Sequence, residues 1–170
     1  KESKALPEDL ETQALALFKE TLAELVDTRK REGEELYGFV NKRQQAIREI
    51  VTTVRTRMPV ILAAQQQALR DRLEALKIEL DDTRLEQEIV VFAQKWDIAE
   101  ELDRLEAHLN EVERVLGLKE PSGRRLDFLM QELNREANTL SSKSIVSETI
   151  RNAVDLKVLI EQMREQIQNI

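Results

Sequence analysis

A chain of 170 residues with 35% charged residues, no cysteine and a formal net charge of −7 excludes several classes of protein. The absence of cysteine removes disulfides, thiolate zinc sites and cysteine nucleophiles, which fits a reducing compartment. The acidic balance argues against a nucleic-acid binder that works by bulk electrostatics, and no apolar run approaches the roughly 18 residues of a membrane span, so we expect a cytoplasmic protein that makes no contact with a membrane.

The first 82 residues predict a long helical hairpin in an all-α fold, because strand formers and turn signals are few and helix formers abound. Pro7 suits the first turn of a helix, and apolar residues recur from Leu10 onward. The seam continues with Val40, Ile47, Val51, Val54 and Met58. Pro59 lacks an N–H and should end or bend this helix, after which leucines up to Leu80 repeat the pattern. Two helices that meet near Pro59 would form an antiparallel hairpin over residues 1–82.

Residues 83–170 predict a C-terminal domain of three helices. The first should begin at Thr83 and end near Gly117, and its apolar stripe is Ile98, Leu102, Leu105, Leu109, Val112 and Leu116. The segment KEPSG, residues 119–123, is a loop signal, and a helix over 124–140 follows it. Residues 141–144 supply a second loop, and a final helix should extend to Ile170.

The predicted helix over 124–140 has an unusual polar face. Its polar positions include Asp127, Gln131, Asn134, Arg135 and Asn138, and Asn is unfavourable inside a helix. Amides that both donate and accept hydrogen bonds suit the recognition of a nucleotide, but a polar interface between helices explains them equally well. Basic residues near these amides, namely Arg124, Arg125, Arg135 and Lys143, would contact phosphate or simply be solvated.

The preceding helix carries a second candidate stripe. Asp97, Glu101, Arg104 and His108 are spaced four, three and four apart, and His108 is the one histidine of the chain. A histidine beside carboxylates can transfer protons near neutral pH or bind a divalent ion, although a surface histidine paired with a glutamate is the more common arrangement. Glu132 and Glu136 form an i, i+4 carboxylate pair that could complete an oxygen-rich site for Mg²⁺ or Mn²⁺.

Three long motifs in the same order resemble the C-terminal domain of the YicC family. They are DIAEELDRLEAHL (97–109), GRRLDFLMQELNREANTLSSKS (123–144) and LKVLIEQMREQIQNI (156–170). The resemblance covers roughly residues 84–170 and implies a bacterial, divalent-metal-dependent endoribonuclease with Mn²⁺ or Mg²⁺ as cofactor. It also implies RNA as partner and a homo-oligomer, with a hexamer among the options.

The family has a separate N-terminal domain, which the resemblance implies is absent or nearly so here. The sequence begins at Lys1 without a methionine, so we expect further sequence upstream. Residues 10–80 look like the helical stretch that joins the two domains. If the missing part carries substrate-binding surface, this chain would fold without being active.

The motif positions that match the family suggest site residues, and the division of roles among them is our own hypothesis. The catalytic candidates are His108, Glu101 and Glu132, and the metal candidates are Glu101, His108, Glu132 and Glu136. The RNA-binding candidates are Arg104, Arg124, Arg125, Gln131, Arg135, Asn138 and Lys143. We expect the site to straddle the KEPSG loop.

Two chemical routes and two non-catalytic alternatives remain open from the sequence. A metal-bound hydroxide could attack the phosphodiester, or the 2′-OH of RNA could attack with His108 as base. Alternatively, the long apolar seams make the chain an oligomerising helical scaffold whose polar stripe is an interface. The remaining alternative is an RNA-binding module that does not cleave.

Overall fold

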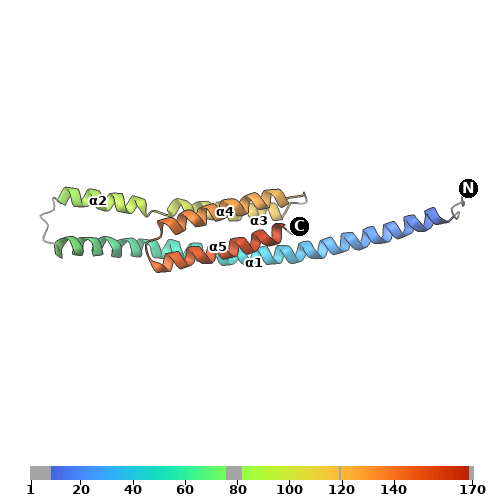
Figure 1. Ribbon diagram of the computed structural model, residues 1–170, viewed down its shortest axis with the longest axis horizontal. Coiled ribbons are helices and arrows are strands. Elements are labelled where there is room, and N and C mark those ends of the chain that lie inside the picture. Colours follow the sequence, from blue (N-terminus) through green and yellow to red (C-terminus); the bar gives the residue numbers. More distant parts are fainter. Residues whose placement is uncertain (1–8, 76–81, 119, 169–170) are drawn as a thin grey trace, which may run out of the picture. The chain divides into compact units, whose positions relative to one another are not determined.

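The computed structural model describes residues 9–75, 82–118 and 120–168. Within these ranges the chain forms helices and no strand (Figure 1), which confirms the all-α prediction. The helices are α1 (Leu10–Ala75), α2 (Asp82–Lys95), α3 (Ala99–Leu116), α4 (Gly123–Lys143) and α5 (Ser147–Gln168). None of these helices combines the length and the apolar character that crossing a membrane requires. The chain divides into two compact units, residues 1–38 and 39–170.

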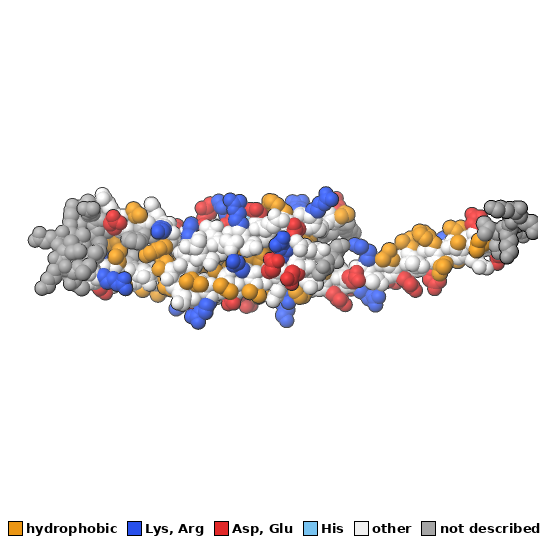
Figure 2. Space-filling view, viewed as in Figure 1, with side chains coloured by type: hydrophobic (Ala, Val, Ile, Leu, Met, Phe, Trp, Pro, Cys, Tyr) orange, Lys and Arg blue, Asp and Glu red, His pale blue; other side chains and the backbone are white. Residues whose placement is uncertain are grey.

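The first unit contains the N-terminal part of α1, whose large apolar side chains are exposed. They include Leu15, Leu17, Phe18, Leu22 and Leu25. Figure 2 shows hydrophobic side chains along one side of this segment and charged side chains along the other. Isolated helices gain little from propensity alone and depend on packing of the apolar face. This segment therefore presents an apolar face that no other described residue of its own unit covers.

The expected break near Pro59 is wrong, because α1 continues through this residue as a single helix. Proline in a helix interior costs about 3 kcal/mol, since it removes one backbone hydrogen bond and crowds the preceding turn. Here Val54, Met58 and Ile61 on the adjoining turns are buried, while Pro59 itself is exposed. Packing of the buried face outweighs the local cost, so no hairpin turn forms at Pro59. The predicted helix start at Pro7 and the leucine pattern up to Leu80 end outside the described residues.

In the second unit, α1 from Phe39 onward packs against α3 and α5. Gln44 contacts Leu109 and Arg55 contacts Asp103, so later residues of α1 meet earlier residues of α3. The same reversal holds toward α5, where Arg57 pairs with Glu148. The helix α4 packs against both α3 and α5. The four helices therefore form an up-down-up-down bundle (Figure 1), and α1 completes the three-helix arrangement that the sequence predicted.

The core of the second unit comes from the predicted apolar stripes of these four helices. Fully buried side chains include Val40, Ile47 and Val54 of α1, Leu102, Leu105 and Leu109 of α3, Leu133 and Leu140 of α4, and Leu156, Ile160 and Met163 of α5. Gln44 lies between Val40 and Ile47 in the α1 seam and is only 2% exposed. Its amide donates a 3.0 Å hydrogen bond to the carbonyl oxygen of Leu109, which satisfies a polar group inside the core.

The helix predicted from Thr83 to Gly117 is interrupted, and this corrects the sequence interpretation. Residues 96–98 separate α2 from α3. The backbone N–H of Ala99 donates a 2.9 Å hydrogen bond to the Asp97 carboxylate, because an Asp side chain near a helix start satisfies a free N–H group. The predicted loop at 119–123 is confirmed for its described residues. The second loop lies later than predicted, at residues 144–146, because α4 continues to Lys143.

Candidate functional site

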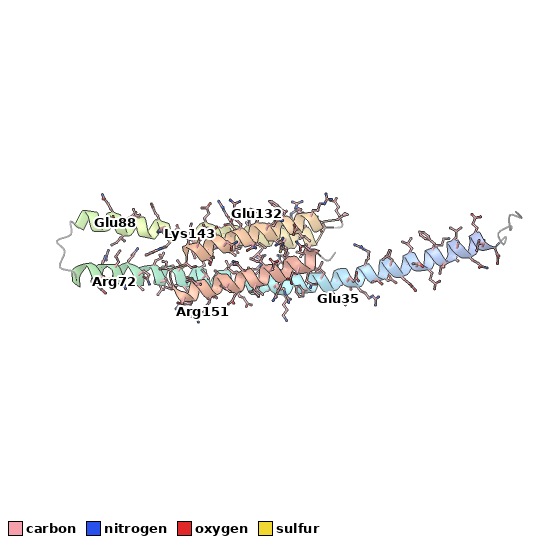
Figure 3. The ribbon with its side chains drawn as sticks, in the orientation of Figure 1. Glu35, Arg72, Glu88, Glu132, Lys143 and Arg151 are labelled. Atoms are coloured by element: carbon pink, nitrogen blue, oxygen red, sulfur yellow. The ribbon has the colours of Figure 1, made fainter. Side chains whose placement is uncertain are left out.

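The candidate residues gather on the antiparallel pair α3 and α4, where charged side chains of the two helices meet. Glu101 of α3 is 6% exposed, and the Lys143 Nζ atom of α4 lies 2.8 Å from its Oε1 atom. Lys143 also donates a 2.9 Å hydrogen bond to the carbonyl oxygen of Asp97. Lys143, labelled at the end of α4 in Figure 3, therefore binds the start of α3 through two contacts. The buried Oε2 atom of Glu101 has no hydrogen-bond partner in the described structure.

A second buried carboxylate lies further along the same helix pair. Glu136 is 4% exposed, and its Oε1 atom lies 3.5 Å from the guanidinium of Arg104 on α3. The same guanidinium pairs with Glu100 one turn earlier. These two carboxylates raise the pKa of Arg104, with Glu100 as the larger cause, so the side chain stays charged. Both buried glutamates therefore have a cation of the neighbouring helix beside them.

His108 and Glu132 lie on facing stretches of α3 and α4. On α3, His108 falls between Arg104 and Glu111; on α4, Glu132 falls between Arg125 and Glu136. Arg104 pairs with Glu136, and Glu111 pairs with Arg125, so these ion pairs bracket the level at which His108 and Glu132 lie. Both side chains are half-buried. The structure thus brings the two predicted catalytic residues to one level of one helix pair.

Beyond His108, towards the loop of residues 117–122, charged groups engage one another. The carboxylate of Glu111 contacts Arg114 at 2.8 Å and Arg125 at 2.6 Å. Hydrogen bonds from Arg114 are the largest cause that lowers the pKa of Glu111 to about 2. Hydrogen bonds from Gln168 and Gln131 lower the pKa of Asp127 as well. Arg125 and Gln131, both predicted to bind RNA, therefore already have intramolecular partners.

Three predicted RNA-binding residues of α4 remain available to a ligand. Arg124 and Arg135 are exposed, and no ion pair involves either of them within the described ranges. Asn138 is exposed too, and its only contact with another side chain is a long 3.4 Å hydrogen bond to Asn134. Figure 2 shows basic and acidic side chains interspersed over the visible face of the bundle. The free cations of α4 are therefore individual residues within a mixed surface.

The predicted metal ligands do not form a metal site within one chain. Among the described residues, no three His, Cys, Asp or Glu side chains are placed to hold an ion together. Glu101, His108, Glu132 and Glu136 all belong to that part of the chain. The two buried carboxylates contact Lys143 and Arg104 instead. The residues present in a single copy therefore do not fit a divalent cation, and a metal requirement stays a prediction.

The sequence interpretation missed the counter-charges that surround the candidate residues. It placed Glu101 and Glu136 as metal ligands and Lys143 and Arg104 as phosphate ligands, whereas the structure pairs each glutamate with one of these cations. The signal was the i, i+7 spacing of Glu136 and Lys143, which puts both on the α4 face that α3 covers. Gln44 was also missed, although it fills the seven-residue gap between Val40 and Ile47.

Comparison with known proteins agrees with the placement of these residues. Residues 54–170 match the family model described as Endoribonuclease YicC-like, C-terminal. The chain is 46% identical over 166 residues to a probable endoribonuclease YicC of Haemophilus influenzae, which covers 98% of this chain and 56% of that protein. It is 31% identical over 154 residues to the probable endoribonuclease YicC of Clostridioides difficile, covering 89% and 53%.

The chain thus spans about half the length of the curated relatives that it matches. The family match includes all of α3, α4 and α5 and the part of α1 that follows Thr53. These are the helices that carry the candidate site, and the match covers well over half of the chain. The chain therefore belongs to the YicC-like endoribonuclease family.

Proposed function

We propose that this chain is the helical C-terminal part of an endoribonuclease and that its α3–α4 face contributes to RNA cleavage. The observation that carries the proposal is the family match over residues 54–170, which contains both helices in full. The relatives are named probable endoribonucleases. The exposed Arg124 and Arg135 support the proposal from the structure, because guanidinium groups bind phosphate with charge-assisted hydrogen bonds.

Each side chain of this face has a proposed role. Arg124, Arg135 and Asn138 contact the RNA backbone and bases, since they are exposed. Lys143 and Arg104 act as positioning residues, because the buried Glu101 and Glu136 hold them against the helix pair. Arg125 and Gln131 support the fold of the same face through Glu111 and Asp127. His108, which is half-buried, is the proposed proton-transfer group, and Glu132 lies at its level.

Proton transfer by His108 implies a specific reaction. The 2′-OH of a ribose would give its proton to the imidazole while its oxygen attacks the adjacent phosphorus. The bond between that phosphorus and the 5′-oxygen of the next nucleotide breaks, and this oxygen takes up a proton. The products are a 2′,3′-cyclic phosphate and a 5′-hydroxyl end. A 3′-hydroxyl or a linear phosphate as the first product would instead favour attack by water or hydroxide.

The cofactor prediction is kept as part of this proposal. A divalent cation such as Mn²⁺ or Mg²⁺ would neutralise charge at the scissile phosphate. Because four carboxylate and imidazole residues of one copy do not form a site, ligands from elsewhere in the longer protein or from a second copy would be needed. Cleavage that is abolished by EDTA and restored by excess Mn²⁺ would support this requirement.

The deciding experiment is cleavage of a labelled RNA by the longer protein and by this chain, each with Mn²⁺, Mg²⁺ or EDTA. His108→Ala and Glu132→Ala should each lower the rate about 100-fold, as expected for loss of a proton-transfer group. Glu88→Ala on α2 is the matched control, because Glu88 is exposed and lies outside the α3–α4 face. Equal cleavage by wild type and both variants would sink the assignment of this face.

A second function has a separate observation in its favour. The apolar side chains of residues 10–38, including Phe18 and Leu22, are exposed in their unit. An oligomerising helical scaffold would use this face for assembly, and homo-oligomer formation is part of our proposal. Activity that is confined to the longer protein and survives His108→Ala would favour the scaffold for this chain.

A further inference from the structure

The solvent side of α5 carries a pattern of side chains that the bundle does not use. Leu156, Ile160 and Met163 face the core, and the opposite side of the helix faces solvent. We define the outer face of α5 as the six exposed residues Arg151, Val154, Asp155, Lys157, Val158 and Glu161. Val154 and Val158 lie at its centre and are each 50% exposed. One exposed valine is ordinary, so the inference depends on how all six are arranged.

The arrangement is self-complementary about the level of Leu156. Val154 and Val158 lie two residues before and after it, and Asp155 and Lys157 lie one residue before and after it. At five residues on either side are Arg151 and Glu161. Each pair of equivalent positions therefore contains either two apolar residues or two opposite charges.

Such a pattern determines how two copies of α5 can meet. When identical helices pack antiparallel about a two-fold axis, a residue before the axis level faces the residue equally far after it in the partner. Val154 would then face Val158 of the partner subunit, and Arg151 would face Glu161 of the partner subunit. Parallel packing would place each charge against its own copy, which is unfavourable. Of the two orientations, the charges select the antiparallel one.

A surface hollow beside this face supports the same occupant. It has a volume of about 350 Å³ and is lined by Asn134, Val154, Lys157, Val158 and Glu161. Glu161 contacts Arg164 at 3.7 Å, a long ion pair that leaves its carboxylate free to meet a second cation. Arg151, labelled in Figure 3, has no ion pair within the described ranges and contacts only the Ser147 carbonyl. The apolar centre and its flanking charges are thus available to a second copy.

We propose that two copies of this chain associate through the outer face of α5, antiparallel, about a two-fold axis at the level of Leu156. The valines form the centre of the contact, and four ion pairs, two of each kind, flank it. This surface lies on a different helix from the candidate residues of α3 and α4. Its failure would therefore leave the proposed function untouched.

The test measures the molar mass of the intact chain by sedimentation over a range of concentrations. Arg151→Glu should raise the dimer dissociation constant at least about tenfold, because it places like charges together at two sites. Glu161→Arg should do the same. The double variant Arg151→Glu with Glu161→Arg restores opposite charges across the axis, so its dissociation constant should return to near the wild-type value.

Control variants distinguish this contact from unfolding and from other interfaces. Val154→Asp should weaken association, whereas Val60→Asp on α1, at a valine that is 62% exposed, should not. Circular dichroism checks that each variant stays helical. Because the chain has no cysteine, Val154→Cys with Val158→Cys should form a disulfide-linked dimer under mild oxidation. Dissociation constants unchanged by Arg151→Glu, no recovery in the double variant, or a monomer at all concentrations would each overturn the proposal.

Discussion

The Nζ atom of Lys143 lies 2.8 Å from Oε1 of Glu101, and this contact joins the end of α4 to the start of α3. Glu101 is almost fully buried, while the Lys143 side chain is 32% exposed. The pair is therefore a partly desolvated ion pair in which the carboxylate depends on the lysine. Removing one partner of such a pair costs more than removing both, because a buried charge is left without compensation.

Lys143→Met should lower the free energy of unfolding by about 2 kcal/mol, because Glu101 then stays buried without its cation. The double variant Lys143→Met with Glu101→Leu should regain most of this loss. Urea unfolding followed by circular dichroism measures both values. Arg70→Met, at an exposed position of α1, is the control and should change stability by less than about 0.5 kcal/mol. Equal losses in the single and double variants would contradict the buried-charge argument.

Pro59→Ala should stabilise the chain by about 2 kcal/mol. The substitution restores a backbone hydrogen bond in α1 and relieves the proline penalty of about 3 kcal/mol. Part of the gain is lost because alanine makes the unfolded chain more flexible. Thermal unfolding should show a higher midpoint than wild type. A lower midpoint would mean that the ring of Pro59 makes a contact that matters more than the missing N–H.

Acidification should weaken the contact between α3 and the start of α4. The folded-state pKa of Glu111 is about 2, below its ordinary value of 4.5, owing mainly to hydrogen bonds from Arg114. A lowered folded-state pKa means that the stabilisation is present above the ordinary value and is lost as the pH falls from about 4.5 towards 2. Glu111→Gln should therefore show a smaller loss of stability over this range than wild type. An unchanged acid dependence would show that other carboxylates dominate.

Arg135→Ala should weaken RNA binding without lowering stability, because Arg135 is exposed and has no ion pair in the described structure. Loss of one phosphate contact should reduce the slope of log affinity against log salt concentration by about 1. Fluorescence anisotropy with a labelled RNA at several salt concentrations measures this slope. Arg72→Ala, an exposed arginine of α1 outside the α3–α4 face, should leave the slope unchanged. An unchanged slope for Arg135→Ala as well would remove this residue from the RNA contact.

The helical class and most of the core were predictable because they depend on periodicity. Val54, Leu105 and Leu133 were placed on apolar stripes from the sequence, and all three are fully buried. The break at Pro59 was not predicted correctly, because the local penalty of proline is readable and the packing that overrides it is not. The interruption at Asp97 was missed for the opposite reason, since the apolar period continues across it.

The candidate site was predictable in its residues but not in its pairing. Glu101, Glu136, Arg104 and Lys143 were all selected from the sequence, yet which carboxylate meets which cation depends on the register of α3 against α4. Helical spacing shows which residues share a face. It does not show that the neighbouring helix brings a charge of opposite sign to that face. For this reason a cluster of acids and bases looked like a metal site.

Gln44 has a consequence for how α1 docks onto the rest of the bundle. A seam of aliphatic side chains alone would tolerate a shift of one heptad, because each layer resembles the next. With Gln44 in the seam, a shifted helix would bury an amide away from the Leu109 carbonyl at a cost of about 1–3 kcal/mol. One polar side chain thus makes the alternative alignments uncompetitive, so α1 has a single docked position against α3.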